Sequence, residues 1–546
     1  MIQELSTDLI KKLKKKGINT FFGVIGGACA RIIEAVIKSG GKYYPVLNEQ
    51  AAGYCAHGYY LSTRKTAGII LTTGPGFTNA VSGIAACYYD NVPLVVLIGQ
   101  VPKTLNVADK FKTKMVGFQE LPHLKIGKNL ADKIFCINSE KSYKRFSKYS
   151  LPKIDTGVSI IEILDDAQRL KVNFNANEAK EAKVKKNKKE KINFSKNFSK
   201  DIKKTKKPIF LLGAGFSRAR ELRKNLNFIN KLNIPVGLSW GGQEISRKVK
   251  KYIGIFGQHS PGIANNYIRN SSIVICLGIS LLQHQTGKVQ NNFAPKAKIV
   301  FVNNNLNECK RAKNQFGKRL IYFNCEISDF LSCFNKSYIS NSSYKKGQYL
   351  PLLPLIKNQN APVNILSSII GKINMNNSII FSDAGATLSW TYQAANLLKK
   401  DCAPIYTSFN LHAMGYANCA AIGAACGSKK DIFVIIGDGS IPMNSQELSW
   451  ANKFKVKFII VDNKGYAIIR QTQKQFYNSF FIGSDFLNKK SSLPYFSIKK
   501  ILKSFNIQTM ETNSNFISQK KLTKFFNRKS SSALIINTLY SADVQQ

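Results

Sequence analysis

The chain has 546 residues, 44% hydrophobic and 20% charged, and its 80 Lys and Arg against 31 Asp and Glu give a formal net charge of +49. This composition is that of a folded globular protein and excludes wholesale disorder, and a length of this size, at about 100–200 residues per domain, favours about three domains. The basic residues are spread along the whole chain instead of forming a stripe with interleaved aromatics, so charge alone does not indicate nucleic-acid binding. A basic protein that binds nucleic acid or anionic surfaces stays as an alternative of another class.

The N-terminal segment, residues 1–17, has the pattern of an amphipathic basic helix. It lacks the order of charge, apolar stretch and small-residue cleavage site that marks a signal peptide. No run approaches the roughly 18 apolar residues of a membrane-spanning helix. We therefore expect a cytoplasmic protein without a membrane partner.

Short apolar runs alternate with helix-length patterns along three stretches of the chain, which is typical of parallel α/β folds. The strand candidates are Ile69–Thr72, Pro93–Ile98, Pro208–Gly213, Ser272–Gly278, Lys298–Val302, Ser378–Ser382, Ile432–Gly437 and Val456–Val461. The predicted fold class is α/β, with three doubly wound parallel-sheet domains. Their predicted bounds are 1–172, 207–335 and 361–546, joined by a lysine-rich linker at 173–206 and a polar linker at 336–360.

The strongest chemical signal lies in the third domain. Gly437-Asp438-Gly439 ends one strand candidate, and Asn463, 25 residues beyond Asp438, ends the next. Ligands of open α/β sheets bind at the carboxyl ends of strands, and glycines there let backbone N–H groups approach a diphosphate. Asp438 and Asn463 supply the oxygen ligands that Mg²⁺ prefers. The alternative for Asp438 alone is a helix cap in a tight turn, and the pairing with Asn463 favours the metal.

This pairing resembles the signature of thiamine diphosphate enzymes, and further matches extend over nearly the whole chain. They are Phe22–Ala28, with Ile25 where the usual form has Pro, Val46–Tyr59, Thr72–Asn79, Gly99–Pro102, Gly117–Glu120 and Asn410–Tyr416. The chain thus resembles the acetolactate synthase-like family of thiamine diphosphate-dependent enzymes. The resemblance implies that the first domain binds the pyrimidine of the cofactor and the third binds its diphosphate with Mg²⁺.

The resemblance also implies roles for single residues. Glu49 would hydrogen-bond the pyrimidine ring and promote proton removal from the thiazolium C2, although a charge at a helix N-terminus is its alternative. The backbone carbonyl of His412 would accept from the pyrimidine amino group, and Met414 would be the apolar wedge that bends the cofactor. Their alternatives are a solvent-facing imidazole and a core methionine. The other implied site residues are Gly437, Gly439 and Ser440 at the diphosphate, Gly465 as a backbone metal ligand, Gln119 near the reacting carbonyl, and Gly27 as an N–H donor to a developing oxyanion.

The central domain carries a weaker motif. Gly213-x-Gly215 follows a strand candidate but lacks the third glycine of a dinucleotide fingerprint, so a tight strand-to-helix turn is the favoured interpretation. Relatives with a flavin hold FAD in this domain, with acidic and arginine-bearing segments after the later strands. Gly278–Leu281 and Val302–Asn305 stand in those places without such residues. Whether the central domain binds FAD stays open at this point, and the sequence weighs against it.

The acceptor pocket departs from the family pattern. Acetolactate synthases carry a tryptophan where Thr472 stands, and a smaller polar residue suggests a different or larger acceptor, such as a keto sugar. Gly257–His259 and His284–Gly287 resemble a subgroup associated with bacterial surface-sugar gene clusters. Arg470 is predicted either to contact a carboxylate or phosphate in a bidentate manner or to be an ordinary surface arginine.

The resemblance implies an enzyme that decarboxylates a 2-keto acid, pyruvate being the expected donor, and transfers the two-carbon unit to an acceptor carbonyl. The acceptor would be a second keto acid or a keto sugar, while oxidation or hydrolysis of the same unit and a non-catalytic cofactor protein are the rivals. In the resembled family the counterparts of Glu49 and Asp438 meet across two subunits. We therefore expect at least a homodimer, against the alternative of a monomer whose own domains close on each other.

Overall fold

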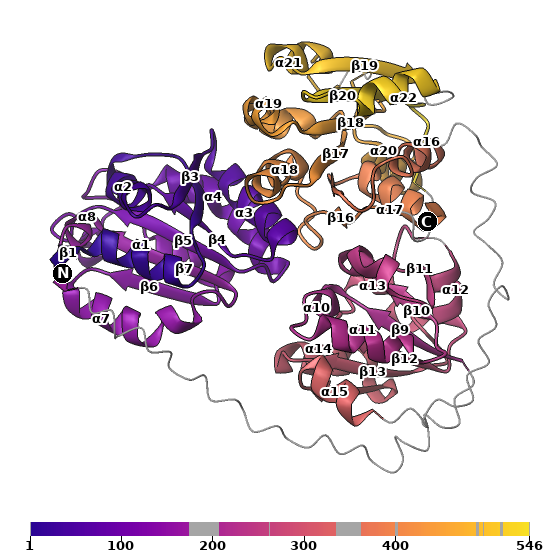
Figure 1. The fold of residues 1–546 in the computed structure, drawn as a ribbon, viewed down its shortest axis with the longest axis horizontal. Helices are drawn as coiled ribbons and strands as arrows, with labels where there is room; N and C mark the ends of the chain where they lie inside the picture. The colour runs from indigo at the N-terminus through magenta and orange to yellow at the C-terminus, as the bar shows by residue number, and fades with distance from the viewer. Residues whose placement is uncertain are drawn as a thin grey trace.

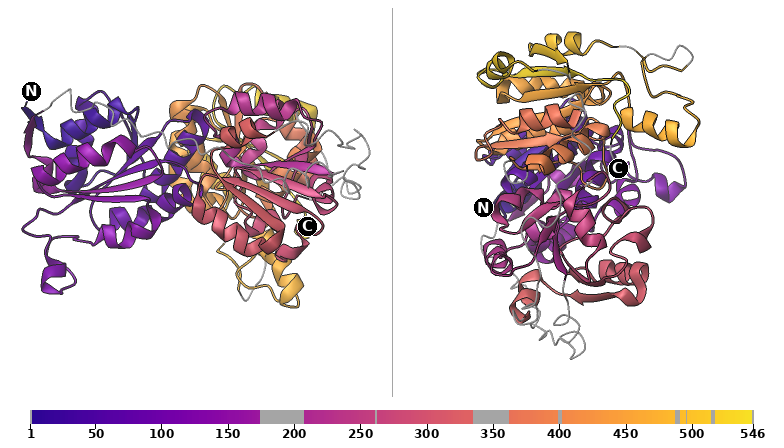
Figure 2. Two further views of the ribbon diagram at one scale, coloured as in Figure 1. Left: turned by 90° about the horizontal axis from the view of Figure 1, so that it is seen from below. Right: turned by 90° about the vertical axis from the view of Figure 1, so that its right-hand side faces the viewer.

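The computed structural model describes residues 2–173, 207–260, 262–334, 362–398, 402–486, 491–494, 496–513 and 517–544. They form three α/β domains, each built on a six-stranded parallel sheet, and the C-terminal domain lies against both of the others (Figures 1 and 2). The predicted fold class is confirmed. Both predicted linkers lie outside the described residues, except for Asn173, which ends a short strand. No helix of the described ranges is long and apolar enough to cross a membrane.

The N-terminal domain has the strand order β3-β2-β4-β5-β7-β6. Its strands are β2 (Thr20–Gly23), β3 (Lys42–Pro45), β4 (Ala67–Leu71), β5 (Leu94–Gln100), β6 (Lys133–Ile137) and β7 (Val158–Leu164), and its longer helices are α1 (Leu5–Lys15), α2 (Ala30–Lys38), α3 (Glu49–Thr63), α4 (Pro75–Tyr89) and α7 (Glu140–Tyr149). Helices α1, α2 and α7 share one core with one face of the sheet, and α3 and α4 pack on the other face. Strands buried on both faces explain the continuous apolar runs in the sequence. A two-stranded antiparallel ribbon of β1 (Ile2–Glu4) and β8 (Lys171–Asn173) joins the ends of the domain.

The central domain has the strand order β11-β10-β9-β12-β13-β14. Its strands are β9 (Pro208–Leu212), β10 (Val236–Leu238), β11 (Tyr252–Ile255), β12 (Ile273–Leu277), β13 (Lys298–Asn303) and β14 (Leu320–Asn324), flanked by α10 (Ala214–Ser217), α11 (Leu222–Asn230), α12 (Ile263–Arg269), α14 (Leu306–Phe316) and α15 (Ile327–Cys333). The Gly213-x-Gly215 turn joins β9 to α10, as the turn interpretation predicts. A Cβ on Gly278, after β12, would lie 2.4 Å from the Phe216 nitrogen. Close packing of two loops therefore accounts for these glycines.

The C-terminal domain has the strand order β16-β15-β17-β18-β20-β19. Its strands are β15 (Ser378–Ser382), β16 (Ile405–Tyr406), β17 (Asp431–Gly437), β18 (Lys457–Asp462), β19 (Gln508–Asn513) and β20 (Ser532–Asn537), and its longer helices are α16 (Pro362–Ile370), α17 (Ala386–Leu398), α18 (Tyr416–Gly427), α20 (Ala467–Phe476), α21 (Ile498–Ser504) and α22 (Gln519–Phe526). Each of the eight predicted strands matches a strand of the structure, with ends that differ by at most two residues.

Helix α3 of the N-terminal domain packs closely against α18 of the C-terminal domain. A Cβ on Gly58 would lie 2.0 Å from the carbonyl oxygen of Ala420, and one on Gly423 would lie 1.9 Å from that of Cys55. Only glycine permits this backbone approach. The two domains share one continuous apolar core, so the start of α3, where Glu49 lies, is fixed relative to the C-terminal domain.

Candidate active site

Asp438 is fixed at the carboxyl edge of the C-terminal sheet, directly after β17. Asp438 is only 2% exposed. Its Oδ1 accepts from the Gly439 N–H at 2.9 Å and its Oδ2 from the Gly465 N–H at 2.8 Å. A Cβ on Gly439 would lie 2.3 Å from the Tyr466 ring, which explains why glycine follows the aspartate. The turn therefore presents a buried carboxylate at the edge where ligands of such sheets bind.

Asn463 follows the neighbouring strand β18 and is 3% exposed. Its side-chain Oδ1 has no hydrogen-bond partner among the residues that the structure describes. A buried acceptor without a partner is costly, and most such atoms in native proteins are satisfied by protein, water or an ion. Two residues on, Gly465 (φ 133°) donates to Asp438, so the carboxylate and the orphaned amide oxygen belong to one site. This donor set fits a hard, oxygen-seeking cation such as Mg²⁺.

Burial raises the pKa of Asp438, and the negative charge of neighbouring Asp462 raises it further. Asp462 is partly neutralised by the ammonium of Lys464, 2.6 Å away. A carboxyl group with a raised pKa keeps its proton to a higher pH, and that proton competes with a metal ion.

The Mg²⁺ affinity of the cofactor-free protein is accordingly expected to fall as the pH drops from about 8 to about 6, by up to about tenfold per unit once Asp438 is protonated. Calorimetric Mg²⁺ titrations at three pH values would measure it. In Asp462→Asn, which removes the neighbouring charge, the loss should begin at a lower pH. An affinity that does not change with pH would rule out Asp438 as the titrating ligand.

Arg470 on α20 does not match either sequence interpretation, since it is 2% exposed and is neither on the surface nor available to a substrate. Its guanidinium donates to the carbonyl oxygens of Asn463 (2.9 Å), Tyr540 (3.1 Å), Lys464 (3.3 Å) and Ser484 (3.3 Å). The Tyr540 ring also lies 4.1 Å from its Cζ. By binding its carbonyl oxygens, Arg470 thus fixes the loop that carries Asn463 and Gly465.

The segment 410–416 is held by Asp383, which sequence reasoning missed. Asp383 accepts from the N–H groups of Gly415 (3.0 Å) and Ala417 (2.8 Å), and burial raises its pKa to about 6. The Ser440 side chain, directly after the Gly437–Gly439 turn, acts on the same carboxyl group and lowers its pKa. The available signal was its position directly after the predicted strand Ser378–Ser382, the same criterion that identified Asp438.

His412 and Met414 lie within this segment and are both half-buried. His412 has a left-handed backbone (φ 52°), and its ring lies 5.7 Å from the Trp240 ring and 5.8 Å from the His284 ring, both in the central domain. The imidazole therefore faces protein instead of solvent, against its alternative interpretation.

Glu49 is the first residue of α3, directly after the N-cap Asn48, so it does occupy the helix N-terminus of its alternative interpretation. Glu49 is 9% exposed, and its carboxylate accepts a hydrogen bond from Asn79 Nδ2 at 3.0 Å. From the C-terminal domain, Glu447 Oε1 accepts from the N–H groups of Leu47 (2.8 Å) and Asn48 (3.2 Å). Burial raises the pKa of Glu447 to about 7. The position of Glu49 is thus set by two domains.

The remaining predicted residues of the N-terminal domain meet at the carboxyl end of β4. A Cβ on Gly74 would lie 2.9 Å from Gln119 Cβ, and one on Gly76 would lie 3.7 Å from Glu49 Oε1. Gly27 is exposed, and a Cβ there would meet no atom of the described chain within 4 Å, so a ligand could approach its backbone. Glu49 and Gln119 therefore lie together at the end of β4, and Gly27 follows the neighbouring strand β2, while Asp438, Asn463 and Gly465 lie on the C-terminal domain.

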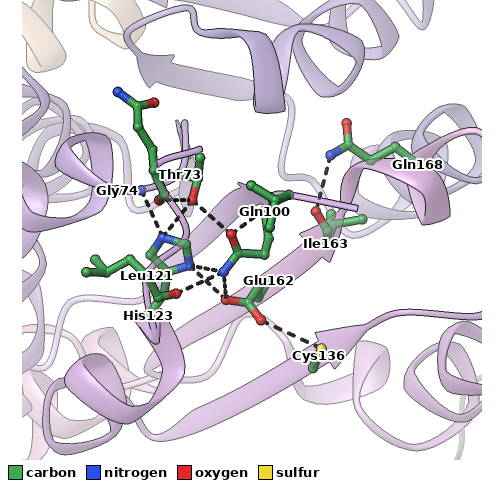
Figure 3. A network of polar contacts seen from close by, with 11 residues as sticks. Thr73, Gly74, Gln100, Leu121, His123, Cys136, Glu162, Ile163 and Gln168 are labelled. Atoms are coloured by element: carbon green, nitrogen blue, oxygen red, sulfur yellow. Dashed lines mark hydrogen bonds and ion pairs between the residues drawn. The ribbon is translucent and has the colours of Figure 1, made fainter. Parts of the chain in front are cut away.

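The backbone of Gln119 (φ 62°) is fixed by a buried polar network that includes Thr73, His123 and Glu162 (Figure 3). Thr73 Oγ1 donates to the Gln119 carbonyl at 2.8 Å, and His123 Nε2 accepts from the Gly74 N–H at 3.1 Å. His123 Nδ1 lies 2.7 Å from Glu162 Oε2, which orients the ring. Nothing in the sequence indicated that Thr73, His123 and Glu162 would meet.

Comparison with known proteins agrees with this arrangement. Three models of thiamine pyrophosphate enzymes match the chain: the N-terminal TPP binding domain at 3–123, the central domain at 196–317 and the C-terminal TPP binding domain at 383–536. Fold and site thus define a thiamine diphosphate-dependent enzyme.

The acetolactate synthase large subunit of Cyanidium caldarium is 26% identical over 503 residues, covering 87% of this chain and 84% of the relative. The probable large subunit of Methanococcus aeolicus is 28% identical over 506 residues, covering 86% and 82%. The chain belongs to the acetolactate synthase-like family of these enzymes.

A solved structure shows the same fold. The benzoylformate decarboxylase of Polynucleobacter necessarius superposes with a TM-score of 0.78 over 100% of both chains, at 15% sequence identity. The superposition supports the three-domain architecture. At this low sequence identity it carries no information on the substrate.

Proposed function

We propose that this enzyme binds thiamine diphosphate and Mg²⁺, decarboxylates a 2-keto acid, with pyruvate as the expected donor, and transfers the two-carbon unit to an acceptor carbonyl. The observation that carries the proposal is the orphaned amide oxygen of Asn463, on the loop whose Gly465 N–H donates to the buried carboxylate of Asp438. The names of the related synthases support the choice of pyruvate. We place the enzyme in the cytoplasm and propose the domain bounds predicted above.

The C-terminal domain would hold the metal and the diphosphate. Asp438 and Asn463 would bind Mg²⁺ through side-chain oxygens, and Gly465 through its carbonyl. Arg470 already occupies the carbonyls of Asn463 and Lys464, which keeps the loop in one conformation. The backbone of Gly437, Gly439 and Ser440 would border the diphosphate. When bound, thiamine diphosphate supplies the electron sink for loss of CO₂.

The N-terminal group would handle the proton and the substrate. Glu49, with Asn79 donating to one oxygen, would hold a proton at the pyrimidine ring. The His412 carbonyl and the Met414 side chain would orient the pyrimidine. The Gly27 N–H and Gln119 would face the reacting carbonyl, where backbone donors stabilise developing negative charge.

Incubation of the purified enzyme with thiamine diphosphate, Mg²⁺, pyruvate and a panel of acceptors, followed by mass analysis, would test the function. The expected result is cofactor-dependent release of CO₂ and a product heavier than the acceptor by C₂H₄O, an acetyl group on the former carbonyl carbon and a hydrogen on its oxygen. Absence of CO₂ release with pyruvate and other 2-keto acids would overturn the proposal.

A keto sugar is the second candidate acceptor. Thr472, which stands where acetolactate synthases carry tryptophan, is exposed, and its hydroxyl donates to the Ile468 carbonyl of its own helix at 3.0 Å. A short side chain on an exposed helix face admits a bulkier acceptor than an indole would. FAD is not required by either reaction, and its presence would be read from the absorption spectrum of the purified protein.

We propose that the two residue groups meet across a homodimer interface. The carboxylate of Glu49 hydrogen-bonds within its own domain, to Asn79. Large apolar side chains beside both groups are exposed: Ile25 (65%), Leu47 (62%) and Phe118 (82%) on the N-terminal domain, and Met443, Ile469 and Phe480 on the C-terminal domain. Exposed apolar surface around a site that must exclude water is expected to be covered by a partner.

Mixing inactive Glu49→Gln chains with inactive Asp438→Ala chains is expected to restore activity, to about a quarter of the wild-type level for random dimers. A mixed dimer contains one site in which both residues are intact. Subunit exchange would be verified with two differently tagged chains. Exchange without any recovery of activity would favour the monomer alternative.

A further inference from the structure

Asp90 is a buried carboxylate of the N-terminal domain that accepts hydrogen bonds from the C-terminal domain, at the start of the segment 409–416. It follows α4 of the N-terminal domain, and its side chain is fully buried. Its Oδ2 accepts from the Phe409 N–H at 2.7 Å and its Oδ1 from the Asn410 N–H at 2.9 Å. The Asn410 side chain donates in return to the Tyr89 carbonyl at 2.8 Å. One carboxylate therefore satisfies two consecutive backbone donors just before His412.

The same carboxylate is connected to the far end of the segment. Asp90 Oδ2 lies 3.0 Å from His57 Nε2, and His57 Nδ1 lies 2.7 Å from the hydroxyl of Tyr416, the first residue of α18. Because a carboxylate only accepts, Nε2 donates to Asp90, and Nδ1 then accepts from the phenol. The segment between Phe409 and Tyr416 is thus held at both ends by one buried chain of hydrogen bonds.

The central domain contacts this junction as well. Arg218 Nη1 donates to the backbone carbonyl of Asp90 at 2.7 Å, and the Trp240 and His284 rings pack on His412. His412 has a left-handed backbone (φ 52°), a conformation that a non-glycine residue keeps only when its surroundings impose it. All three domains therefore meet on the segment that contains this strained residue.

We infer that Asp90 is a positioning residue for thiamine diphosphate, which acts by fixing the backbone of 409–416 so that the His412 carbonyl and Met414 are in place before the cofactor arrives. The inference rests on the proposed roles of these two residues. Without the carboxylate, two buried N–H groups lose their acceptor, and cofactor binding must then supply the free energy that orders the segment.

The test compares Asp90→Asn with wild type in the full-length enzyme. The asparagine has the same size but offers one acceptor in place of two, and it cannot accept from both N–H groups and His57. Thiamine diphosphate affinity at saturating Mg²⁺, followed by tryptophan fluorescence, is expected to fall about 10–100-fold, the range seen when outer partners of ligand-holding residues are removed. The Mg²⁺ affinity measured without cofactor should stay within about twofold, because Asp438 and Asn463 are untouched.

Asp8→Asn is the matched control. Asp8 is a buried carboxylate of the same domain that accepts from Gln3 (2.9 Å) and pairs with Lys12 (2.8 Å), but it lies on α1, across the sheet from α4. It should lower the unfolding midpoint without changing cofactor affinity. Unchanged cofactor affinity in Asp90→Asn, or an equal loss in Asp8→Asn, would overturn the inference.

If Asp90→Asn does not fold, Tyr416→Phe decides the question, since it removes only the hydroxyl that donates to His57 and keeps the ring. A cofactor affinity several-fold weaker supports the inference, and wild-type affinity refutes it. Wild-type enzyme that binds no thiamine diphosphate would instead refute the proposed function. The two failures are therefore distinguishable.

Discussion

Glu49→Gln is expected to bind thiamine diphosphate with near wild-type affinity and to lose about 10²–10⁴-fold in turnover, the range typical of general acid–base groups. The substitution preserves the size of the side chain and the acceptor for Asn79 Nδ2, which lies 3.0 Å from Glu49 Oε2. The α3 N-terminus should stay intact because its cap is Asn48, whose Oδ1 accepts from the Gln50 N–H at 2.9 Å. The variant loses only the capacity to take up and return a proton.

Steady-state CO₂ release from pyruvate, measured at saturating cofactor, would give the turnover. Glu34→Gln, an exposed glutamate on α2 of the same domain, is the control and should retain wild-type activity. Full turnover in Glu49→Gln would leave Glu49 with the structural role of a helix N-terminal charge and would remove it from the mechanism.

Asp438→Ala is expected to abolish measurable binding of thiamine diphosphate in the presence of Mg²⁺. Asp438 provides the carboxylate of the proposed metal site and accepts from both Gly439 and Gly465. The alanine removes the anionic ligand and frees the loop that carries Gly465. Since Mg²⁺ is usually held jointly by a few carboxylates and the substrate phosphates, the diphosphate loses its anchor as well.

Fluorescence titration with and without EDTA would measure this effect. Asp431→Ala is the matched control, because Asp431 is exposed at the opposite end of the same strand, β17, and should bind the cofactor normally. Equal affinity of Asp438→Ala and wild type, in both conditions, would show that the diphosphate is held elsewhere.

Positioning of this site depends on buried charged groups, one of which comes from another domain. Arg470 holds the loop at 463–465, Asp383 accepts from the N–H groups of residues 415 and 417, and Asp90, from another domain, accepts from those of residues 409 and 410. Each binds backbone groups, so each fixes main-chain geometry without contacting a ligand. Substitutions at these residues should therefore impair cofactor affinity more than they impair the chemical step.

The sequence alone determined the three sheets and where the central pair of the proposed metal site lies in the C-terminal sheet. Parallel strands buried on both faces must be continuous apolar runs, so β5, β12 and β17 were visible as such. Asp438 and Asn463 follow strands that are adjacent in the chain and in the sheet, and carboxyl ends of neighbouring parallel strands necessarily meet at one edge. At this edge the local sequence pattern is therefore enough to predict where the two residues lie in the fold.

Only the tertiary structure decided what surrounds that pair. Asp90 and Phe409 are separated by 319 residues, and the acceptor role of Asp90 depends on how α3 and α18 pack, which no local pattern encodes. Arg470 appeared to be a surface or substrate-binding arginine because the chain is rich in charge and a guanidinium can bind a carboxylate or phosphate, yet its partners are carbonyls of loops that fold over it. Hydrogen bonds from a side chain to a remote backbone leave no trace in residue type, since every residue has a carbonyl and nearly every residue an N–H.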